Sequence, residues 1–220
     1  MTLLACYGGS FDPVHLGHLA VARAVRDALD AEVALVPAAD PPHKDATHAS
    51  AAQRVEMLAL AIDGEPGLRV DPRELGRAGP SYTIDTLRLL RAEQGPHRPI
   101  AWVGGGDSLL QLDTWLRWRE LFAHGHGLAV ARPGAPLADA DIASRAPAVQ
   151  RQLGFRRRPA EALAEAPAGG FAVLDLPELR PESSTGVRAL IAAGGAWDTM
   201  VAPAVAGFIR AHRLYGYTGP

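Results

Sequence analysis

One stretch near the start of the chain decides its fold: Gly8-Gly9-Ser10-Phe11-Asp12-Pro13-Val14-His15-Leu16-Gly17-His18. Before it, residues 3–7 form a short apolar run, which is typical of a buried strand that enters a tight turn at glycine. After it, residues 16–29 place apolar side chains at helical spacing. We therefore predict that this stretch is the turn from a first strand into a first helix.

Further along the chain, strand-like and helix-like segments continue to alternate. Strands are predicted at residues 33–36, 100–103, 128–130 and 171–174, and helices at 51–62, from 81 or 83 to 95, from 183 or 184 through 190, and at 204–212. In the helix at 51–62, the spacing predicts a core-facing side made of Val55, Leu58, Ala59 and Ile62. The alternation predicts an α/β fold, with a doubly wound, mostly parallel, Rossmann-like sheet, helices on both faces and ligands at the carboxyl ends of the strands. We expect residues 1–220 to form one domain, with a helical or loop region at about 133–170.

The composition excludes several classes of protein. The net charge is −2 over 220 residues, whereas a general nucleic-acid binder usually has a strong basic excess. No apolar stretch approaches the ~20 residues that span a bilayer. Cys6 is the only cysteine, which excludes an intramolecular disulfide and a thiol-rich metal site. We predict a cytoplasmic protein that binds neither nucleic acid nor membrane, and the sequence leaves open whether it forms a homo-oligomer.

The quoted stretch has the features of a phosphate-binding turn. Its glycines let the backbone approach a ligand, and the helix start offers unpaired N–H groups with a partial positive charge. His15 and His18 are expected on one helix face, where both could donate hydrogen bonds to phosphate oxygens. Gly17 between them is expected to leave room for a nucleotide against the backbone. The pair could instead hold a metal, but Asp12 is the only further ligand in the segment, and we predict no protein metal site.

Two commoner phosphate loops do not match this sequence. There is no Gly-Lys-Ser/Thr ending of a Walker loop, and the spacing after Gly8 does not fit Gly-x-Gly-x-x-Gly, which argues against a P-loop ATPase and a dehydrogenase. Lys44 is the only lysine among 22 lysine and arginine residues. A compact, flexible ammonium suits a moving polyphosphate, so we predict a functional contact for Lys44, although chance could also leave one lysine.

The quoted stretch contains His15-Leu16-Gly17-His18, which resembles the motif that gives the HxGH nucleotidyltransferase superfamily its name. Near the other end, Ser183-Ser184-Thr185-Gly186-Val187-Arg188 is similar to the ISSTxxR element of that superfamily, although alone it could be an ordinary helix cap. Four further stretches resemble the nicotinate-mononucleotide adenylyltransferases: Pro41-Pro42-His43-Lys44, Pro80-Ser81-Tyr82-Thr83-Ile84-Asp85-Thr86-Leu87, Gly105-Gly106-Asp107-Ser108-Leu109 and Asp113-Thr114-Trp115. The similarity covers most of the chain except about 133–170.

The resemblance implies a reaction and a set of site residues. The reaction is transfer of AMP from ATP to nicotinate mononucleotide, with release of pyrophosphate and with Mg²⁺ accompanying ATP. By similarity, ATP is bound by Gly8, Gly9, Ser10, Phe11, His15, His18, Lys44, Gly104, Asp107, Ser184, Thr185 and Arg188, with His15, His18 and Lys44 at the reacting phosphates. Nicotinate mononucleotide is bound by Thr83, Trp115 and Leu116, with its pyridine ring stacked on Trp115.

Other interpretations of the same residues stay open. A superfamily member acting on phosphopantetheine or another phosphorylated alcohol would share the HxGH chemistry, but such relatives often lack the Thr-Trp element. Nicotinamide mononucleotide differs from nicotinate mononucleotide in lacking the negative carboxylate, and the sequence leaves open which of the two is the preferred substrate. A module that senses ATP without turning it over would not need His15, His18, Lys44 and Arg188 together. Trp115 could also be a core or surface aromatic residue.

Overall fold

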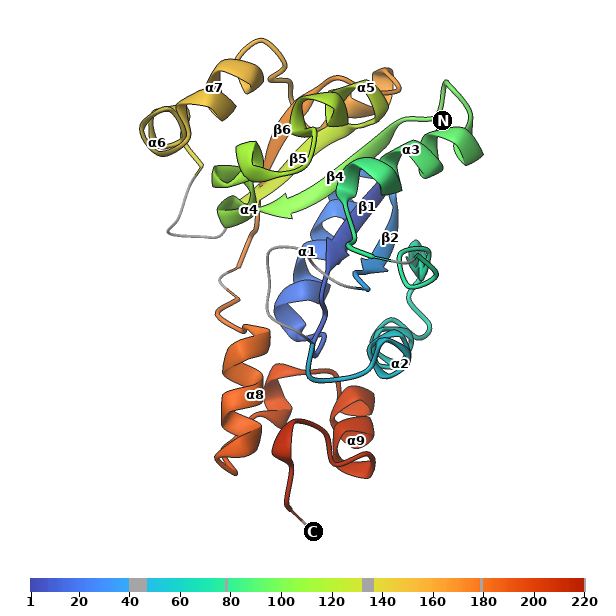
Figure 1. Ribbon diagram of the computed structural model, residues 1–220, viewed down its shortest axis with the longest axis vertical. Helices are drawn as coiled ribbons and strands as arrows, with labels where there is room; N and C mark the ends of the chain where they lie inside the picture. The colour runs from blue at the N-terminus through green and yellow to red at the C-terminus, as the bar shows by residue number, and fades with distance from the viewer. Residues whose placement is uncertain (40–46, 78, 132–136, 179, 220) are drawn as a thin grey trace.

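The computed structural model describes residues 1–39, 47–77, 79–131, 137–178 and 180–219. Within these ranges the strands form one six-stranded parallel sheet in the order β3-β2-β1-β4-β5-β6 (Figure 1). The strands are β1 (Leu4–Gly9), β2 (Glu32–Pro37), β3 (Leu68–Val70), β4 (Ile100–Gly105), β5 (His126–Ala131) and β6 (Phe171–Asp175). This order confirms the predicted α/β fold with a doubly wound parallel sheet.

Helices connect the strands and cover both faces of the sheet. The α-helices of the described residues are α1 (Leu16–Leu29), α2 (Ala51–Ala61), α3 (Thr83–Gln94), α4 (Gly106–Leu110), α5 (Leu121–His124), α6 (Asp139–Arg145), α7 (Pro147–Leu153), α8 (Ser184–Ala192) and α9 (Pro203–Ala211). One apolar cluster joins a sheet face to α1, α2, α8 and α9, and a second joins the other face to α3 through α7. In Figure 1, α8 and α9 lie below the sheet in orange and red, and α9 packs on α2. In the described part of the chain, every helix is too short or too polar to cross a membrane.

The first strand illustrates how the sequence builds both clusters. Leu3 and Ala5 point into the first cluster, whereas Leu4 and Cys6 point into the second. A strand that is buried on both faces requires a continuous apolar run, which is why it could be recognised from the sequence. Burial, with smaller contributions from Glu74 and other charges, raises the pKa of the Cys6 thiol to about 12. Cys6 is therefore an unreactive packing residue.

Most predicted elements are confirmed, and those that were missed are short. The helix predicted at 16–29 coincides with α1, and the predicted helices at 51–62 and 204–212 correspond to α2 and α9. The edge strand β3 and the short helices α4 and α5 were not predicted, because three to five residues carry too little periodicity. The described part of the region at about 133–170 contains α6, α7 and a 3₁₀ turn, η3 (Glu161–Glu165).

The buried side of α2 was predicted wrongly in part. Leu58 is buried as expected, but Ala59 is exposed and Val55 is partly exposed. The helix instead buries Arg54, which is 0% exposed and donates a hydrogen bond from Nη1 to the carbonyl oxygen of Ser10 at 2.7 Å. Periodicity arguments place arginine outside the core, but a buried carbonyl group needs a donor, and Arg54 supplies it.

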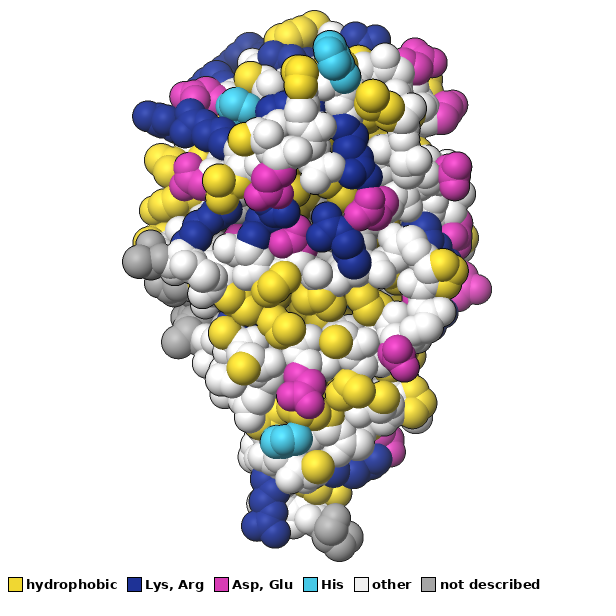
Figure 2. All heavy atoms as spheres, turned by 90° about the vertical axis from the view of Figure 1, so that its right-hand side faces the viewer, with side chains coloured by type: hydrophobic (Ala, Val, Ile, Leu, Met, Phe, Trp, Pro, Cys, Tyr) yellow, Lys and Arg dark blue, Asp and Glu magenta, His cyan; other side chains and the backbone are white. Residues whose placement is uncertain are grey.

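Charges of both signs lie side by side on part of the surface. Figure 2 shows arginine and acidic side chains next to one another on one side of the molecule. At the edge formed by β2 and β3, ion pairs join Glu32 to Arg69 and Arg98, and Asp71 to Arg69 and Arg73. Burial opposes ionisation of Glu32 and Asp71, but hydrogen bonds from arginine outweigh it and lower the pKa of both carboxyl groups. Paired charges along an edge strand oppose pairing with another sheet.

His126, the first residue of β5, is a buried core histidine. Its side chain is 0% exposed. Nδ1 accepts a hydrogen bond from the backbone N–H of Gly170 at 2.9 Å, and Nε2 lies 2.8 Å from the carbonyl oxygen of Ala166. Nδ1 must therefore be unprotonated, and the hydrogen is on Nε2, so the ring is neutral. Burial lowers the pKa of His126 below its ordinary value of 6.5.

We expect the free energy of unfolding to fall as the pH drops below about 6.5. The folded protein binds a proton at His126 less readily than the unfolded chain, so stability that is present above that pH is lost as the pH falls toward the lowered pKa. His124, whose pKa is lowered by burial and by Arg88 and Arg91, adds to the slope. Urea unfolding at about pH 7.5 and about pH 5.5 measures the difference. The difference in the free energy of unfolding between the two pH values should shrink in His126→Gln but not in the exposed control His97→Gln. An equal pH dependence of stability in both variants would contradict the role assigned to His126.

Candidate active site

The strand order creates a topological switch point between β1 and β4. From β1 the chain continues to β2 and β3 on one side of the sheet, and it then returns to β4 on the other side. Tyr7 of β1 pairs with Val103 of β4, so the two strands end side by side, at Gly9 and Gly105. Open α/β sheets bind ligands in the crevice outside the carboxyl ends of the strands at such a point. The segments that follow β1 and β4 are therefore the candidate site.

The backbone at the ends of both strands is open to a ligand. A Cβ atom added to Gly8 or Gly105 would have no other atom within 4 Å. Gly9 has a different role, since its Cβ would lie 3.0 Å from the ring of Phe11. Phe11 is fully buried, and its backbone φ is 49°. Among the predicted ATP-binding residues of this turn, Gly8 therefore offers an open backbone, whereas the Phe11 ring belongs to the core.

His15 and His18 lie together at the start of α1, as predicted. His15 is the N-cap residue, and its backbone N–H donates to Nδ1 of His18 at 3.2 Å. The two rings stack with their centroids 3.7 Å apart, and the ring of Phe11 meets His18 edge-on at 4.9 Å. His15 is 5% exposed, whereas His18 is partly exposed. A ligand at the sheet edge therefore reaches His18 more readily than His15.

The packing around Gly17 shows a need for glycine that the sequence did not indicate. A Cβ atom at Gly17 would lie 3.0 Å from the His15 ring and 3.4 Å from the carbonyl oxygen of Glu182. Contacts at such distances are tighter than ordinary van der Waals packing. The glycine therefore makes room for the imidazole of His15 and for the chain that leads into α8, and its predicted contact with a nucleotide stays a prediction.

The second predicted motif packs directly on the first. Ser183 caps α8 with its side chain. Ser184 Oγ donates to the carbonyl oxygen of Pro13 at 3.0 Å, and Arg188 Nη1 donates to the carbonyl oxygen of Asp12 at 2.7 Å. Two motifs that are far apart in the sequence are thus joined by hydrogen bonds. The starts of α1 and α8 therefore lie next to each other.

The other predicted ATP-binding residues differ in what they offer. Asp107 is exposed in the first turn of α4, directly after β4. Thr185 is exposed, and its hydroxyl accepts a hydrogen bond from Arg188 at 3.4 Å. A Cβ atom at Gly104 would make only ordinary contacts, the nearest at 3.5 Å, so glycine is not required there by packing. Lys44 lies outside the described residues.

The residues predicted to bind nicotinate mononucleotide come from two segments on one face of the sheet. Thr83 is the first residue of α3, and Tyr82 before it packs against the second apolar cluster. Trp115 follows a 3₁₀ turn, η1 (Leu112–Thr114), and packs against the same cluster. Leu116 is 44% exposed. The helix start at Thr83 and the Trp115–Leu116 segment therefore adjoin a common apolar layer.

The structure distinguishes Trp115, which is predicted to stack on the pyridine ring, from Trp118 three residues later. Trp118 is 5% exposed, and Arg119 lies over its ring at 4.3 Å. Trp115 remains partly exposed, and its ring is tilted against that of Trp102 of β4 with their centroids 5.9 Å apart. Trp115 is therefore the one of the two whose ring is partly exposed, while Trp118 belongs to the core.

Three residues at this site have roles that the sequence did not indicate. The carboxylate of Asp12, considered only as a metal ligand, accepts hydrogen bonds from the backbone of His48 and Ala49 and from the hydroxyl of Tyr215. Arg54 holds the same turn through the carbonyl group described above. A carboxylate within a Gly/Pro turn is a recognisable acceptor signal that could have identified Asp12. The sequence carries no comparable signal for Arg54 or Tyr215.

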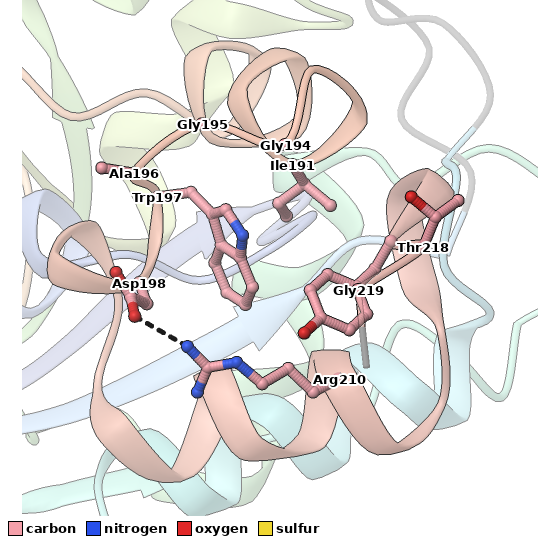
Figure 3. A pocket seen from close by; sticks show the side chains of 10 residues that line it. Ile191, Gly194, Gly195, Ala196, Trp197, Asp198, Arg210, Thr218 and Gly219 are labelled. Carbon is pink, nitrogen blue, oxygen red and sulfur yellow. Dashed lines mark hydrogen bonds and ion pairs between the residues drawn. The ribbon is translucent and has the colours of Figure 1, made fainter.

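Away from the predicted site, a hollow lies between α8, α9 and the last described residues (Figure 3). It has a volume of about 480 Å³ and is lined by Ile191, Gly194, Gly195, Ala196, Trp197, Asp198, Arg210, Tyr217, Thr218 and Gly219. Arg210 donates to Asp198 at 2.7 Å and lies over the Trp197 ring at 5.2 Å, so its charge is already paired. The hollow contains no residue of the predicted site, and we assign it no ligand.

The parallel strand order, the open glycine turn at the switch point and the paired histidines at a helix start are the arrangement expected of a nucleotidyltransferase on a Rossmann-like sheet. Protein-family models agree with this class, because the model of the cytidylyltransferase-like family matches residues 6–190.

Comparison with similar proteins shows to which family of nucleotidyltransferases the chain belongs. A probable nicotinate-nucleotide adenylyltransferase of Stenotrophomonas maltophilia is 52% identical, with 98% of this chain and 97% of the relative covered. A second probable nicotinate-nucleotide adenylyltransferase, of Laribacter hongkongensis, is 46% identical, with 99% of this chain and 96% of the relative covered. The solved structure of Plasmodium falciparum nicotinic acid mononucleotide adenylyltransferase complexed with NaAD shares the fold, with a TM-score of 0.74, 16% identity and 99% of both chains covered. The chain therefore belongs to the nicotinate-nucleotide adenylyltransferase family. It is a nucleotidyltransferase that transfers AMP in NAD biosynthesis.

Proposed function

We propose that AMP passes from ATP to nicotinate mononucleotide at the junction of β1, β4 and α8, by direct in-line attack. A phosphate oxygen of the mononucleotide forms a bond to the α-phosphorus, the bond to the bridging oxygen breaks, and pyrophosphate leaves. The supporting observation is the hydrogen-bonded contact of Ser184 and Arg188 with the turn before α1. A nucleotide phosphate is already anionic near neutral pH, so positioning and charge stabilisation suffice, without a covalent intermediate.

His18 is the proposed donor to the α-phosphate. Its Nδ1 accepts a hydrogen bond from the backbone N–H of His15, so the hydrogen of the neutral ring is on Nε2. An Nε2–H group held in this way can donate to an oxygen on which negative charge develops. His15 stacks behind His18, and we assign it to the phosphates beyond the α-phosphate.

Two cations complete the proposed polyphosphate site. Arg188 contacts the turn before α1 through Nη1 and Thr185 through Nη2, and the donors of the fork that are not used in these contacts suit phosphate oxygens. The assignment of Lys44 to the β- and γ-phosphates rests on similarity and on its being the only lysine. The open backbone at Gly8 leaves space for the nucleotide, and Asp107 after β4 suits a ribose hydroxyl.

The proposed pyridine site lies between the start of α3 and the segment after η1. Trp115 offers a partly exposed ring for stacking. The carboxylate that distinguishes nicotinate from nicotinamide would accept hydrogen bonds from backbone N–H groups near Thr83 and Leu116. The first turn of a helix supplies such unpaired donors.

Mg²⁺ enters this proposal as part of the Mg·ATP substrate. Among the residues that the structure describes, no three His, Cys, Asp or Glu side chains gather in a way that could hold a metal ion. We propose that the ion is bound mainly by phosphate oxygens and water, as Mg²⁺ often is at nucleotide sites. The ion would neutralise charge on the triphosphate.

We also propose that residues 1–220 act as one nucleotidyltransferase domain, because α9 packs on α2 and α8 is hydrogen-bonded to the turn before α1. A cytoplasmic location remains a prediction from the sequence.

The substrate is tested by pyrophosphate release with Mg·ATP and one acceptor at a time. We expect strong preference for nicotinate mononucleotide over nicotinamide mononucleotide, because only the former has a carboxylate for the backbone donors. We expect no pyrophosphate release when phosphopantetheine is the acceptor. Preference for nicotinamide mononucleotide would contradict the proposed carboxylate contact, and preference for phosphopantetheine would keep the phosphate chemistry but reject the pyridine site. ATP binding without turnover of any acceptor would instead favour a sensing module.

A further inference from the structure

The side chain and backbone of Asp12 connect segments that are far apart in the sequence. The residue is 3% exposed. Oδ2 accepts a hydrogen bond from the N–H of His48 at 2.7 Å, and Oδ1 accepts from the N–H of Ala49 at 3.1 Å and from the Tyr215 hydroxyl at 2.9 Å. Its backbone oxygen accepts from Arg188 at 2.7 Å. Asp12 is therefore held from the loop before α2, from α8 and from the last turn of the described chain.

Tyr215 lies in a 3₁₀ turn, η5 (Leu214–Gly216), in an unfavourable backbone conformation. Its φ of 57° and ψ of 28° lie in the left-handed region, which favours glycine. Such a conformation persists only where the surroundings hold it. The Tyr215 hydroxyl is held by Asp12, and two residues later the ring of Tyr217 meets Trp197 edge-on at 6.0 Å.

The Tyr215 hydroxyl is suited to remain a hydrogen-bond donor. Burial raises the pKa of this phenol, and the neighbouring Asp12 carboxylate raises it further. The phenol therefore keeps its proton at neutral pH. A hydrogen bond from a hydroxyl to a carboxylate is charge-assisted, and it is stronger and more directional than one between neutral groups.

Few contacts separate Asp12 from the proposed catalytic ring. Three residues after Asp12, the backbone N–H of His15 donates to Nδ1 of His18, which fixes the rotation of that ring. Between them, the carbonyl oxygen of Pro13 accepts from Ser184. The direction of His18 Nε2 thus depends on the backbone from Asp12 to His15.

We propose that Tyr215 is a positioning residue for AMP transfer, because its hydroxyl, through Asp12, fixes the turn before α1 and so directs the His18 ring at the α-phosphate. The inference rests on the proposed role of His18. Tyr215 touches no substrate. Loss of the hydroxyl frees the turn to shift by a fraction of an ångström, and misplacing a catalytic group slows the chemical step more than it weakens substrate binding.

The first test is Tyr215→Phe, which removes only the hydroxyl. Well below the unfolding temperature, we expect kcat for pyrophosphate release to fall roughly 10-fold, with KM for nicotinate mononucleotide unchanged. The matched control is Tyr217→Phe, which changes a tyrosine of the same segment that packs on Trp197, and it should keep wild-type kinetics. An unchanged kcat in Tyr215→Phe would overturn the proposal, since a merely structural role lowers the unfolding temperature without slowing the folded enzyme.

A second test combines Tyr215→Phe with His18→Ala. If Tyr215 acts through His18, the double variant should have nearly the kcat of His18→Ala alone, because residues that act as a unit are not additive. A further fall of roughly 10-fold in the double variant would overturn the proposal, since Tyr215 would then act on another group.

Hydrogen exchange of the substrate-free protein separates this inference from the proposed function. The backbone amides of residues 12 and 14–18 should exchange faster in Tyr215→Phe than in the wild type, and at the wild-type rate in Tyr217→Phe. Faster exchange would support the link from Tyr215 to the turn even if the wild type released no pyrophosphate, in which case the proposed function alone would fail. Unchanged exchange would overturn the positioning role itself.

Discussion

Replacing His18 with alanine is expected to lower kcat by roughly 10²–10³-fold, or about 3–4 kcal/mol of transition-state stabilisation. The ring is oriented before substrate arrives, since the backbone N–H of His15 holds Nδ1 and leaves the hydrogen on Nε2. A preorganised donor acts mainly on charge that develops in the transition state, so KM for nicotinate mononucleotide should change little. Steady-state pyrophosphate release measures both constants.

Two further variants make this result specific. His18→Gln keeps an amide N–H near the position of Nε2 and should lose less activity than His18→Ala. His97→Ala removes an exposed histidine and should behave as wild type. Thermal unfolding must accompany the kinetics, because His18 also packs against Phe11. Near-normal turnover by folded His18→Ala would remove this histidine from the mechanism.

Much of the fold could be predicted because its central strands are buried on both faces. The apolar run at residues 3–7 and the glycines after it indicated a strand and a turn, and they correspond to β1 and the start of the site. The helical spacing at residues 16–29 likewise coincides with α1. The edge strand β3 has only three residues, which is too short for periodicity to distinguish it from a loop.

The site was predictable where its residues are consecutive and less so where they are far apart. The His15–His18 pair is local, whereas Arg188 was assigned to the same site only by similarity. The roles of Arg54 and Tyr215 depend on single hydrogen bonds across long stretches of chain, which no local pattern encodes. The close approach of the His15 ring to Gly17 was missed for the same reason, because the direction of that side chain is set only in three dimensions.

Replacing Arg188 with alanine is expected to lower kcat/KM for ATP by roughly 10–10²-fold, as expected for loss of a hydrogen bond to a charged group worth about 1.5–3 kcal/mol. Its Nη1 donates to the carbonyl oxygen of Asp12 at 2.7 Å, so the guanidinium is fixed beside the turn that leads into α1 and His18. The remaining donors of the fork are assigned to ATP phosphates. The variant should therefore affect ATP more than nicotinate mononucleotide, which steady-state titration of each substrate measures.

Arg188→Gln and Arg188→Lys separate the charge of this residue from its role as an anchor. Glutamine retains an N–H donor for the Asp12 carbonyl group but carries no charge, whereas lysine retains the charge but lacks the planar fork. If Arg188 contacts phosphate, Arg188→Gln should lose nearly as much kcat/KM for ATP as Arg188→Ala, and Arg188→Lys should lose less. Wild-type use of ATP by Arg188→Gln would show that the residue only anchors α8 to the turn. The ATP phosphates would then need another cation, and Lys44 would become the main candidate.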